Sequence, residues 1–363
     1  MNDVRELKQY VWAHARAQGV PLSHYEDLLS RITSDVDGAD GSWTREWVRA
    51  GEALERDGKL LEAGQYYNLA RFPFVAGPER AEALERCVSA FDRWRREAGG
   101  IERVEVDTPT GRFGAWGTGL STRDKQPLLV FMGGIVSVKE QWAPLLPVLR
   151  KLGVAAIAAE LPGVGENPLP YDDKSHRLFS DLLDAVADRA DVSRTHLLPL
   201  SFSGHLALRC ALGDERIRGL VTVGAPLREF FTDPAWWSSL PRLTVDTLVH
   251  LTGVPEAGLQ DHVRGWAITA GEIASLRIPV GYVACSRDEI IPPGDPALLR
   301  EHAREPRVVE FDDVHGAPEH SREMQAWALL ATLRMLGGRR VPRALFGTVL
   351  AGQRLGRLLR SRA

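Results

Sequence analysis

The chain has 363 residues, a formal net charge of −3, 44% hydrophobic residues and 26% charged residues. This composition is typical of a globular protein with a sizeable core, and the near-neutral charge argues against a nucleic-acid partner. The three cysteines lie far apart without C-x-x-C spacing, which argues against a disulfide framework or a zinc site, and no apolar run reaches the roughly 20 residues of a bilayer span.

Residues 1–98 are predicted to form a helical domain. The stretches WTREWVRAGEALERDGKLLEAGQYYNLARFPF and GPERAEALERCVSAFDRWRREAGG place apolar residues at helical spacing, and a Gly pair ends the second stretch. No strict repeat period is visible, so a simple helical domain is favoured over an array of helical repeats.

Residues 99–337 show strands alternating with helices. IERVEVDT and GRFGAWGTG alternate in polarity and carry Gly breakers, which predicts an antiparallel hairpin. QPLLVFMGG, VAAIAAELPG, THLLPL, GLVTVGAP and IPVGYVACS are short, nearly continuous apolar runs, as expected of parallel strands covered by helices on both faces. The predicted fold class is therefore α/β, with a mostly parallel central sheet and right-handed crossovers.

Two segments depart from this alternation. The insertion at residues 227–270 is aromatic-rich, is predicted to be helical, and would lie beyond the carboxyl ends of the strands, where such sheets bind ligands. Residues 338–363 are basic and carry apolar residues at helical spacing. A packed C-terminal helix with a frayed tail is favoured there over a membrane-surface or partner-binding helix.

A serine-bearing turn between a strand and a helix is the most informative segment. In THLLPLSFSGHLALRCA, residues 195–211, a buried strand leads into a tight turn and a helix, an arrangement that exposes a nucleophilic serine. Ser201 is the preferred nucleophile, although Pro199 and Ser203 stand where the usual G-x-S-x-G pattern has glycines. Ser203 is the alternative, but a turn centred on it would place His205 where strand and helix need a small residue.

Candidates for an acid and a base follow Ser201 in the chain. Asp288 comes just after the strand IPVGYVACS, and His315 follows the strand VVEFDD on the loop before the final helix. The order serine, acid, histidine is that of α/β-hydrolases, in which the histidine takes a proton from the serine and the acid orients the histidine. His320 is a weaker candidate for the base because it falls inside or at the start of the final helix.

The loop FMGGIVSVKEQW, after the first central strand, is the candidate oxyanion hole. Its paired glycines allow a close backbone approach, so the amides of Gly134 or Ile135, together with that of Phe202, are the expected donors. The chain lacks G-x-x-x-x-G-K-[ST], and AAELPGVGENP lacks the third glycine of a dinucleotide site. No cofactor and no metal are therefore expected.

At these motifs the chain resembles the FrsA-like α/β-hydrolases, a group that includes the 2,6-dihydroxypseudooxynicotine hydrolases and the fungal Ayg1-type polyketide-shortening hydrolases. MGGIVSVKEQW is similar to their GG-[LI]-x-S-x-K-E loop, and PLSFSGHLALRCA is similar to their G-x-S-x-G-G elbow with Ser201 aligned. Trp43, Trp47 and the A-x-x-Y-Y and A-x-F-P patterns at residues 63–67 and 70–73 resemble their helical segment.

The resemblance implies a catalytic domain of the α/β-hydrolase fold that is capped by the N-terminal helices and acts on esters or on carbon–carbon bonds next to carbonyls. The implied triad is Ser201, Asp288 and His315. The chain departs from the family at the two elbow glycines and at Glu160, where an aspartate is common. The same fold also resembles lyases of tetronate antibiotic pathways, which eliminate acetate from an acetylated intermediate.

The leading hypothesis is a serine hydrolase for a small, largely apolar substrate, either polyketide-like or aromatic, with Phe230, Trp236 and Trp237 lining the pocket. The N-terminus lacks an apolar signal core, so a cytoplasmic location is expected. One alternative keeps the site but eliminates a carboxylate, and another is a non-catalytic binding protein on the same scaffold. The sequence leaves a homodimer open.

Overall fold

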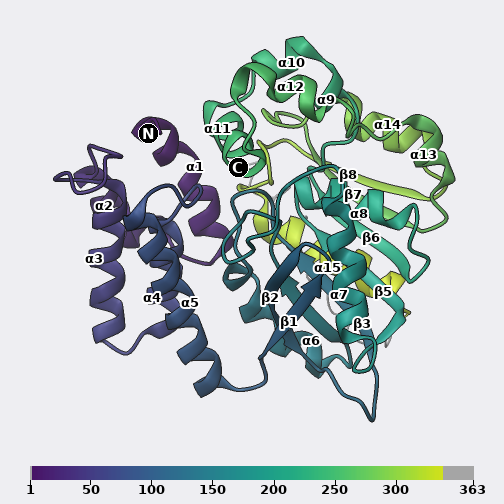
Figure 1. Cartoon of the computed structure of the whole chain (residues 1–363), viewed down its shortest axis with the longest axis horizontal. Helices are drawn as coiled ribbons and strands as arrows, with labels where there is room; N and C mark the ends of the chain where they lie inside the picture. Colours follow the sequence, from purple (N-terminus) through teal and green to yellow (C-terminus); the bar gives the residue numbers. More distant parts are fainter. Residues whose placement is uncertain (1, 338–363) are drawn as a thin grey trace, which may run out of the picture.

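The chain forms a group of N-terminal helices followed by a layered α/β domain (Figure 1). The structure, a computed structural model, describes residues 2–337, and the predicted basic C-terminal helix at 338–363 lies outside the described residues. The N-terminal helices are α1 (Val4–Ala17), η1 (Leu22–His24), α2 (Glu26–Arg31), α3 (Trp43–Arg56), α4 (Leu60–Ala70) and α5 (Pro78–Ala98).

Aromatic side chains hold the N-terminal helices together. Trp43 and Trp47 lie one turn apart on α3, are fully buried, and have ring centroids 6.0 Å apart. Trp47 also packs edge-on against Tyr66 of α4 at 5.4 Å. The indole N–H of Trp43 donates to the carbonyl of Leu69 at 2.9 Å, which satisfies a buried donor. The tryptophans noted in the sequence therefore form the core of this segment.

The α/β domain is built on an eight-stranded sheet with the strand order β1-β2-β4-β3-β5-β6-β7-β8. The prediction of a hairpin followed by a mostly parallel sheet is confirmed, because β1 and β2 pair antiparallel, β2 joins β4 antiparallel, and all further pairs are parallel. The strands are β1 (Glu102–Thr108), β2 (Gly111–Thr118), β3 (Pro127–Met132), β4 (Ala155–Ala159), β5 (Asp191–Pro199), β6 (Ile217–Val223), β7 (Val280–Cys285) and β8 (Pro306–Phe311).

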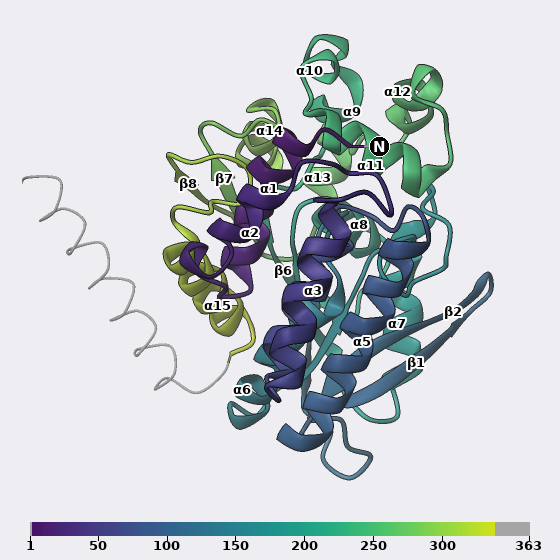
Figure 2. The same ribbon diagram turned by 90° about the vertical axis from the view of Figure 1, so that its left-hand side faces the viewer.

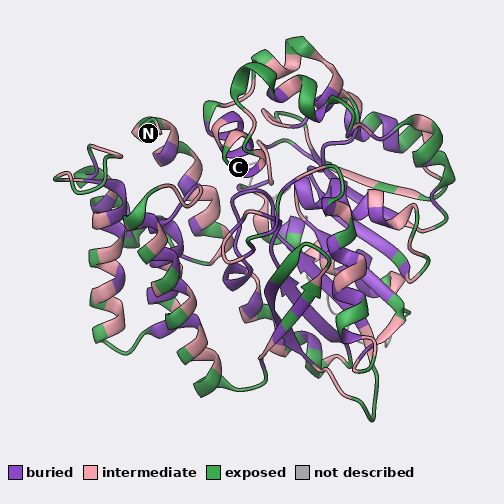
Figure 3. Ribbon diagram, in the orientation of Figure 1, coloured by how far each residue is buried: buried purple, intermediate pink, exposed green. Residues whose placement is uncertain are grey.

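Helices cover both faces of this sheet, and the central strands are buried between them (Figure 3). Leu129 of β3 clusters with apolar residues of α6 and α15, whereas its neighbours Leu128 and Val130 cluster with those of α7, α8 and α14. The covering elements are η2 (Lys139–Gln141), η3 (Ala143–Leu145), α6 (Leu146–Lys151), η4 (Ser175–Arg177), α7 (Leu178–Val186), α8 (Phe202–Ala211), α14 (Gly294–His302) and α15 (Ser321–Met335).

The helices of the insertion lie beyond the carboxyl ends of the strands, as predicted (Figure 1). Asp295 at the start of α14 anchors them, because its buried carboxylate accepts the amides of Leu227 and Arg228 at 2.8 Å and that of Glu229 at 2.7 Å. The helices are α9 (Glu229–Thr232), α10 (Pro234–Ser238), α11 (Arg242–Thr252) and α12 (Glu256–Arg264), with α13 (Ala270–Ser275) leading to β7.

The N-terminal helices and the insertion contact each other beyond the carboxyl ends of the strands. Glu6 of α1 accepts the amide of Leu243 at the start of α11 at 3.1 Å. Phe74 stacks on His250 of α11 with ring centroids 4.5 Å apart. Figure 2, in which the N-terminal helices face the viewer, shows α1 at this end of the sheet. Within residues 2–337, no helix combines the length and the apolar character needed to cross a bilayer.

Candidate active site

Ser201 occupies the sharp turn between β5 and α8. Its backbone has φ 57° and ψ −128°, a conformation that is strained for a residue with a Cβ and persists only where the surrounding structure enforces it. The enforcing bonds run to both neighbouring strands: the Leu200 amide donates to Met132 of β3 at 2.9 Å, and the Ser201 amide donates to Val223 of β6 at 2.7 Å. This is the geometry of a nucleophile elbow.

Ser203 belongs to the internal bonding of the same turn. Its side chain is fully buried, and Oγ accepts the Leu200 amide at 2.9 Å while lying 2.9 Å from the carbonyl oxygens of Met132 and Leu200. A hydroxyl engaged in this way is not available to a substrate, so the geometry favours Ser201. The elbow requires α8 to pack closely against β6, and Gly204 allows this, because a Cβ on it would lie 2.1 Å from a threonine hydroxyl of β6.

His315 and Asp288 lie in line with Ser201. His315 Nε2 is 3.0 Å from Ser201 Oγ, and His315 Nδ1 is 3.0 Å and 3.1 Å from the two carboxylate oxygens of Asp288. Because Asp288 follows β7 and His315 follows β8, three different strand ends bring together the trio expected from the sequence. His320, the weaker candidate base, instead bonds to Asp313 at 2.9 Å.

The surroundings of His315 favour its charged form. Burial alone lowers the pKa of His315, but the charge and hydrogen bond of Asp288, together with the charge of Glu289, outweigh burial and raise the pKa above 6.5. Asp288 is itself held in place, because its Oδ1 accepts the amides of Ile290 at 3.0 Å and Ile291 at 2.8 Å. His315 is therefore oriented by a fixed carboxylate and is a stronger base than a free histidine.

Gly224 and Asp313 support His315 and were not expected from the sequence. Gly224 follows β6 with φ 60°, and a Cβ on it would stand 2.7 Å from Cε1 of the His315 ring. Asp313 is buried and accepts the amides of Glu319 and His320 at 2.8 Å and 3.1 Å, which closes the loop that carries His315. The glycine in GLVTVGAP and the aspartate before VHG were the available signals, but each also fits an ordinary turn.

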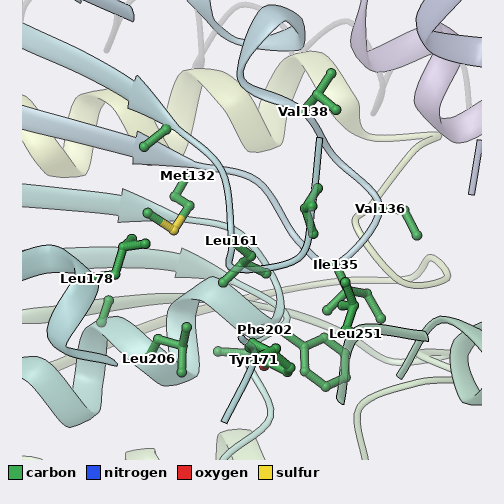
Figure 4. Packing of buried hydrophobic residues seen from close by; sticks show 14 of the residues in the cluster. Met132, Ile135, Val136, Val138, Leu161, Tyr171, Leu178, Phe202, Leu206 and Leu251 are labelled. Carbon is green, nitrogen blue, oxygen red and sulfur yellow. The ribbon is translucent and has the colours of Figure 1, made fainter. Parts of the chain in front are cut away.

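The loop after β3 brings backbone amides to Ser201. A Cβ on Gly134 would lie 3.0 Å from Cβ and 3.4 Å from Oγ of Ser201, so this approach needs a glycine. Ile135 and Phe202 line the same cavity as Ser201, and their amides donate to no other group within residues 2–337. Figure 4 shows Met132 at the end of β3 and Ile135 on the loop beyond it. An oxyanion hole uses unpaired amides beside the nucleophile, so these two amides are the candidates for that role.

A buried charge cluster holds the far end of this loop. Lys139 is fully buried, and its ammonium lies 2.9 Å from Glu160 and 2.7 Å from Glu166. Glu160 also accepts the backbone amide of Lys139 at 3.0 Å. Arg71, buried at the end of α4, donates to the carbonyl of Val136 on the same loop. Lys139 of the loop motif and Glu160, which replaces a common aspartate, therefore hold the loop in place together.

A cavity of about 380 Å³ lies over Ser201 and His315. Its walls come from α1, from the loop after β3, from the loop that carries His315, and from the start of α11. Apolar and aromatic side chains make up most of this lining. Those contributed by α1 and the segment after α4 include Tyr10, Trp12, Ala13, His14, Ala17 and Phe72.

The predicted aromatic lining of the pocket needs a correction. Phe230, Trp236 and Trp237 lie outside the lining of this cavity. Phe230 is fully buried and packs edge-on against Phe202 at 5.2 Å and against Trp237 at 5.3 Å. The indole N–H of Trp236 donates to the carbonyl of Ile290 at 2.8 Å. These aromatic residues fix the insertion to the domain. The aromatic wall of the cavity comes from α1 together with Phe72, Trp142 and Phe202.

Comparison with known proteins assigns the chain to a family. A family model described as Esterase FrsA-like matches residues 17–284. The chain belongs to the FrsA-like family. Esterase FrsA of Vibrio cholerae serotype O1 is 24% identical over 327 residues, covering 80% of this chain and 78% of that protein. Esterase FrsA of Photobacterium profundum is 22% identical over 359 residues, covering 87% and 84%.

Solved structures agree with this assignment. AbyA5 wildtype is 56% identical, with a TM-score of 0.93, and the match covers 97% of this chain and 99% of that one. The 2,6-dihydroxy-pseudo-oxynicotine hydrolase is 19% identical with a TM-score of 0.69, covering 89% and 96%, and shows the shared fold. This FrsA-like chain is thus an enzyme of the α/β-hydrolase fold, and its predicted fold class is confirmed.

The FrsA-like elbow of this chain tolerates its two substituted glycine positions for different reasons. Pro199 is the last residue of β5, opposite Met132, where a missing amide N–H costs little. Ser203 turns its hydroxyl back into the turn and replaces the flexibility of a glycine with a hydrogen bond. Neither substitution displaces Ser201 from hydrogen-bonding distance of His315.

Proposed function

We propose that this chain is a serine-dependent esterase that acts on a carboxylic ester of a small, largely apolar substrate, either polyketide-like or aromatic. The observation that carries this proposal is the 3.0 Å distance between His315 Nε2 and Ser201 Oγ at the wall of a largely apolar cavity. The same groups would serve cleavage of a carbon–carbon bond next to a carbonyl.

In the proposed reaction, Ser201 Oγ adds to the ester carbonyl while His315 Nε2 takes the hydroxyl proton. Asp288 holds the imidazole and stabilises its positive charge, and the amides of Ile135 and Phe202 bind the oxyanion. Collapse of the tetrahedral intermediate breaks the bond from the carbonyl carbon to the alcohol oxygen, which takes the proton from His315. Water then repeats the sequence on the acyl-serine and releases the acid.

The lining of the cavity supports a substrate without a localised charge. Among the described lining residues there is no lysine and no arginine, and the carboxylate of Glu289 would repel an anion. Most of the wall is apolar, with a few polar side chains, as in sites for small organic ligands. A volume of about 380 Å³ suits a compact ring system.

Trapping of the acyl-serine tests the proposal. The protein is mixed with 4-nitrophenyl acetate, quenched in acid, and examined by intact-mass and peptide mass spectrometry. One added acetyl group on the peptide that contains Ser201, absent in Ser201→Ala, is the expected result. Turnover of the ester by Ser201→Ala at the wild-type rate would contradict nucleophilic catalysis by Ser201.

A second candidate function is elimination of a carboxylate, such as acetate from an acetylated tetronate. The observation that favours it is the apolar wall that α1 places over His315, because elimination uses a base and consumes no water. His315 Nε2 would remove a proton from the carbon next to the one bearing the acetate, the C–O bond would break, and a carbon–carbon double bond would form. The oxyanion hole would stabilise the enolate or the leaving acetate.

Product analysis separates the two reactions. An acetylated tetronate that yields acetate and the free alcohol supports the esterase, whereas acetate with a new exocyclic double bond supports the lyase. Solvent labelled with ¹⁸O adds a second criterion, because only hydrolysis places solvent oxygen in the released acetate.

A further inference from the structure

Three side chains in the cavity wall have polar atoms without a hydrogen-bond partner among residues 2–337. Oε1 of Gln141 and Nε1 of Trp142 are buried and lack a hydrogen bond. The imidazole of His14 makes none within residues 2–337. All three side chains line the cavity that holds Ser201 and His315. Buried polar groups such as the Gln141 side chain are normally hydrogen-bonded, and the half-buried His14 lines the same cavity, so a ligand can supply the missing partners.

His14 is held in place without using its nitrogens. It lies on α1, and its ring packs against Phe72 with centroids 4.9 Å apart. Burial first, and then the charges of Arg71 and His315, lower the pKa of His14 to about 3, so that the ring is neutral during turnover. A neutral imidazole presents one hydrogen-bond donor and one acceptor.

Gln141 lines the same cavity as His14 but comes from the α/β domain. It is 7% exposed and belongs to η2, directly after the loop motif that carries Gly134 and Ile135. Its amide supplies an acceptor and two donors. Together with His14, these groups can satisfy a hydroxyl, which donates and accepts, or a carbonyl, which accepts. The absence of lysine and arginine among the described lining residues argues against a carboxylate or phosphate.

We propose that His14 and Gln141 form a second polar subsite, which binds a hydroxyl or carbonyl oxygen that the substrate carries outside the reacting ester. This inference rests on the proposed function and narrows its substrate class to oxygenated rings. The subsite joins α1 to the loop after β3, so the N-terminal helix takes part in substrate selection as well as in covering the site.

Paired esters with and without an extra oxygen test the subsite. The probes are phenyl acetate and its ortho-, meta- and para-hydroxy derivatives, and the variants are His14→Phe and Gln141→Leu. We expect the wild type to have a lower KM for at least one hydroxyphenyl ester than for phenyl acetate. Each variant should raise that KM about tenfold more than it raises the KM for phenyl acetate. His24→Phe, at an exposed histidine of the same helical segment, is the matched control and should change neither value.

Binding measured without turnover separates this inference from the proposed function. Calorimetry with Ser201→Ala compares phenol with the dihydroxybenzenes, and the same comparison is made in Ser201→Ala combined with His14→Phe. Tighter binding of one dihydroxybenzene that disappears in the double variant supports the subsite even if no ester is hydrolysed. No preference for any oxygenated probe in either assay, or equal losses for plain and hydroxylated esters in both variants, would overturn it.

Discussion

The Oγ of Ser203 lies 2.9 Å from the carbonyl oxygen of Met132, which ties the turn after β5 to the end of β3. In the usual elbow a glycine stands at this position. The serine here adds a hydrogen-bonded hydroxyl that points into the turn and away from the cavity. The departure from the motif therefore strengthens the support of Ser201.

Replacement of Ser203 by alanine should weaken the fold and spare the chemistry. The Leu200 amide would keep the Met132 carbonyl as its acceptor but lose its bond to the Ser203 hydroxyl, and the turn would lose the bond of that hydroxyl to Met132, so the free energy of unfolding in urea should fall by about 1 kcal/mol. At a temperature where the variant is folded, kcat for an aryl ester should stay within about threefold of the wild-type value. Loss of all activity by a folded Ser203→Ala would make Ser203 the nucleophile.

The pH dependence of activity should report the raised pKa of His315. The imidazole must be neutral to accept the serine proton, so activity is lost as the pH falls through this pKa. Because Asp288 and Glu289 outweigh burial and raise the pKa, the acid limb of kcat/KM should lie above pH 6.5. A pH series with an uncharged aryl ester measures this limb.

Removal of the Asp288 charge should shift this limb in a known direction. In Asp288→Asn, burial remains while the main stabilising charge is gone, so the acid limb should move to lower pH and kcat should drop by roughly 10⁴. An unchanged limb in this variant would mean that a group other than His315 is titrating.

Gly224 shows why part of the site could not be predicted. The candidate catalytic residues follow strand ends in a set order, and that order led to the prediction of Ser201, Asp288 and His315, which the structure places within hydrogen-bonding distance of one another. The support of His315 by Gly224 depends on how β6 and the loop after β8 approach each other in space, which no local pattern records.

The prediction that aromatic residues of the insertion line the cavity was wrong for a related reason. Its composition correctly indicated a helical insertion beyond the strand ends. Which way its rings point depends on the anchoring of the insertion by Asp295 and on contacts such as that of Phe230 with Phe202. The role of α1 was missed because an amphipathic helix with a histidine, VRELKQYVWAHARA, fits many positions in a fold.

Gly224→Ala should damage catalysis more than it damages the fold. The left-handed backbone alone costs about 1–2 kcal/mol for a residue with a Cβ. Displacement of the His315 ring should lower kcat/KM by roughly 100-fold. Gly213→Ala is the control, since a Cβ there meets no atom of residues 2–337 within 4 Å. Thermal melts and steady-state kinetics of both variants measure the two effects, and near-normal kinetics in Gly224→Ala would refute the assigned contact.

Lys139→Met should lower the free energy of unfolding by about 3–5 kcal/mol, because it leaves the buried carboxylate of Glu160 without its cation. Denaturant titration measures the loss. The exposed Lys151→Met is the control and should lie within about 0.5 kcal/mol of the wild type. Equal stabilities of the two variants would show that the cluster does not hold the loop after β3.

Labelling with a fluorophosphonate, followed by peptide mass spectrometry, determines whether Ser201 is the nucleophile. The wild type and Ser203→Ala should each carry one label on Ser201, at a rate that falls sharply in His315→Ala, and Ser201→Ala should carry none. A label that persists in Ser201→Ala at the wild-type rate, or that is found on Ser203, would show that Ser201 is not the nucleophile.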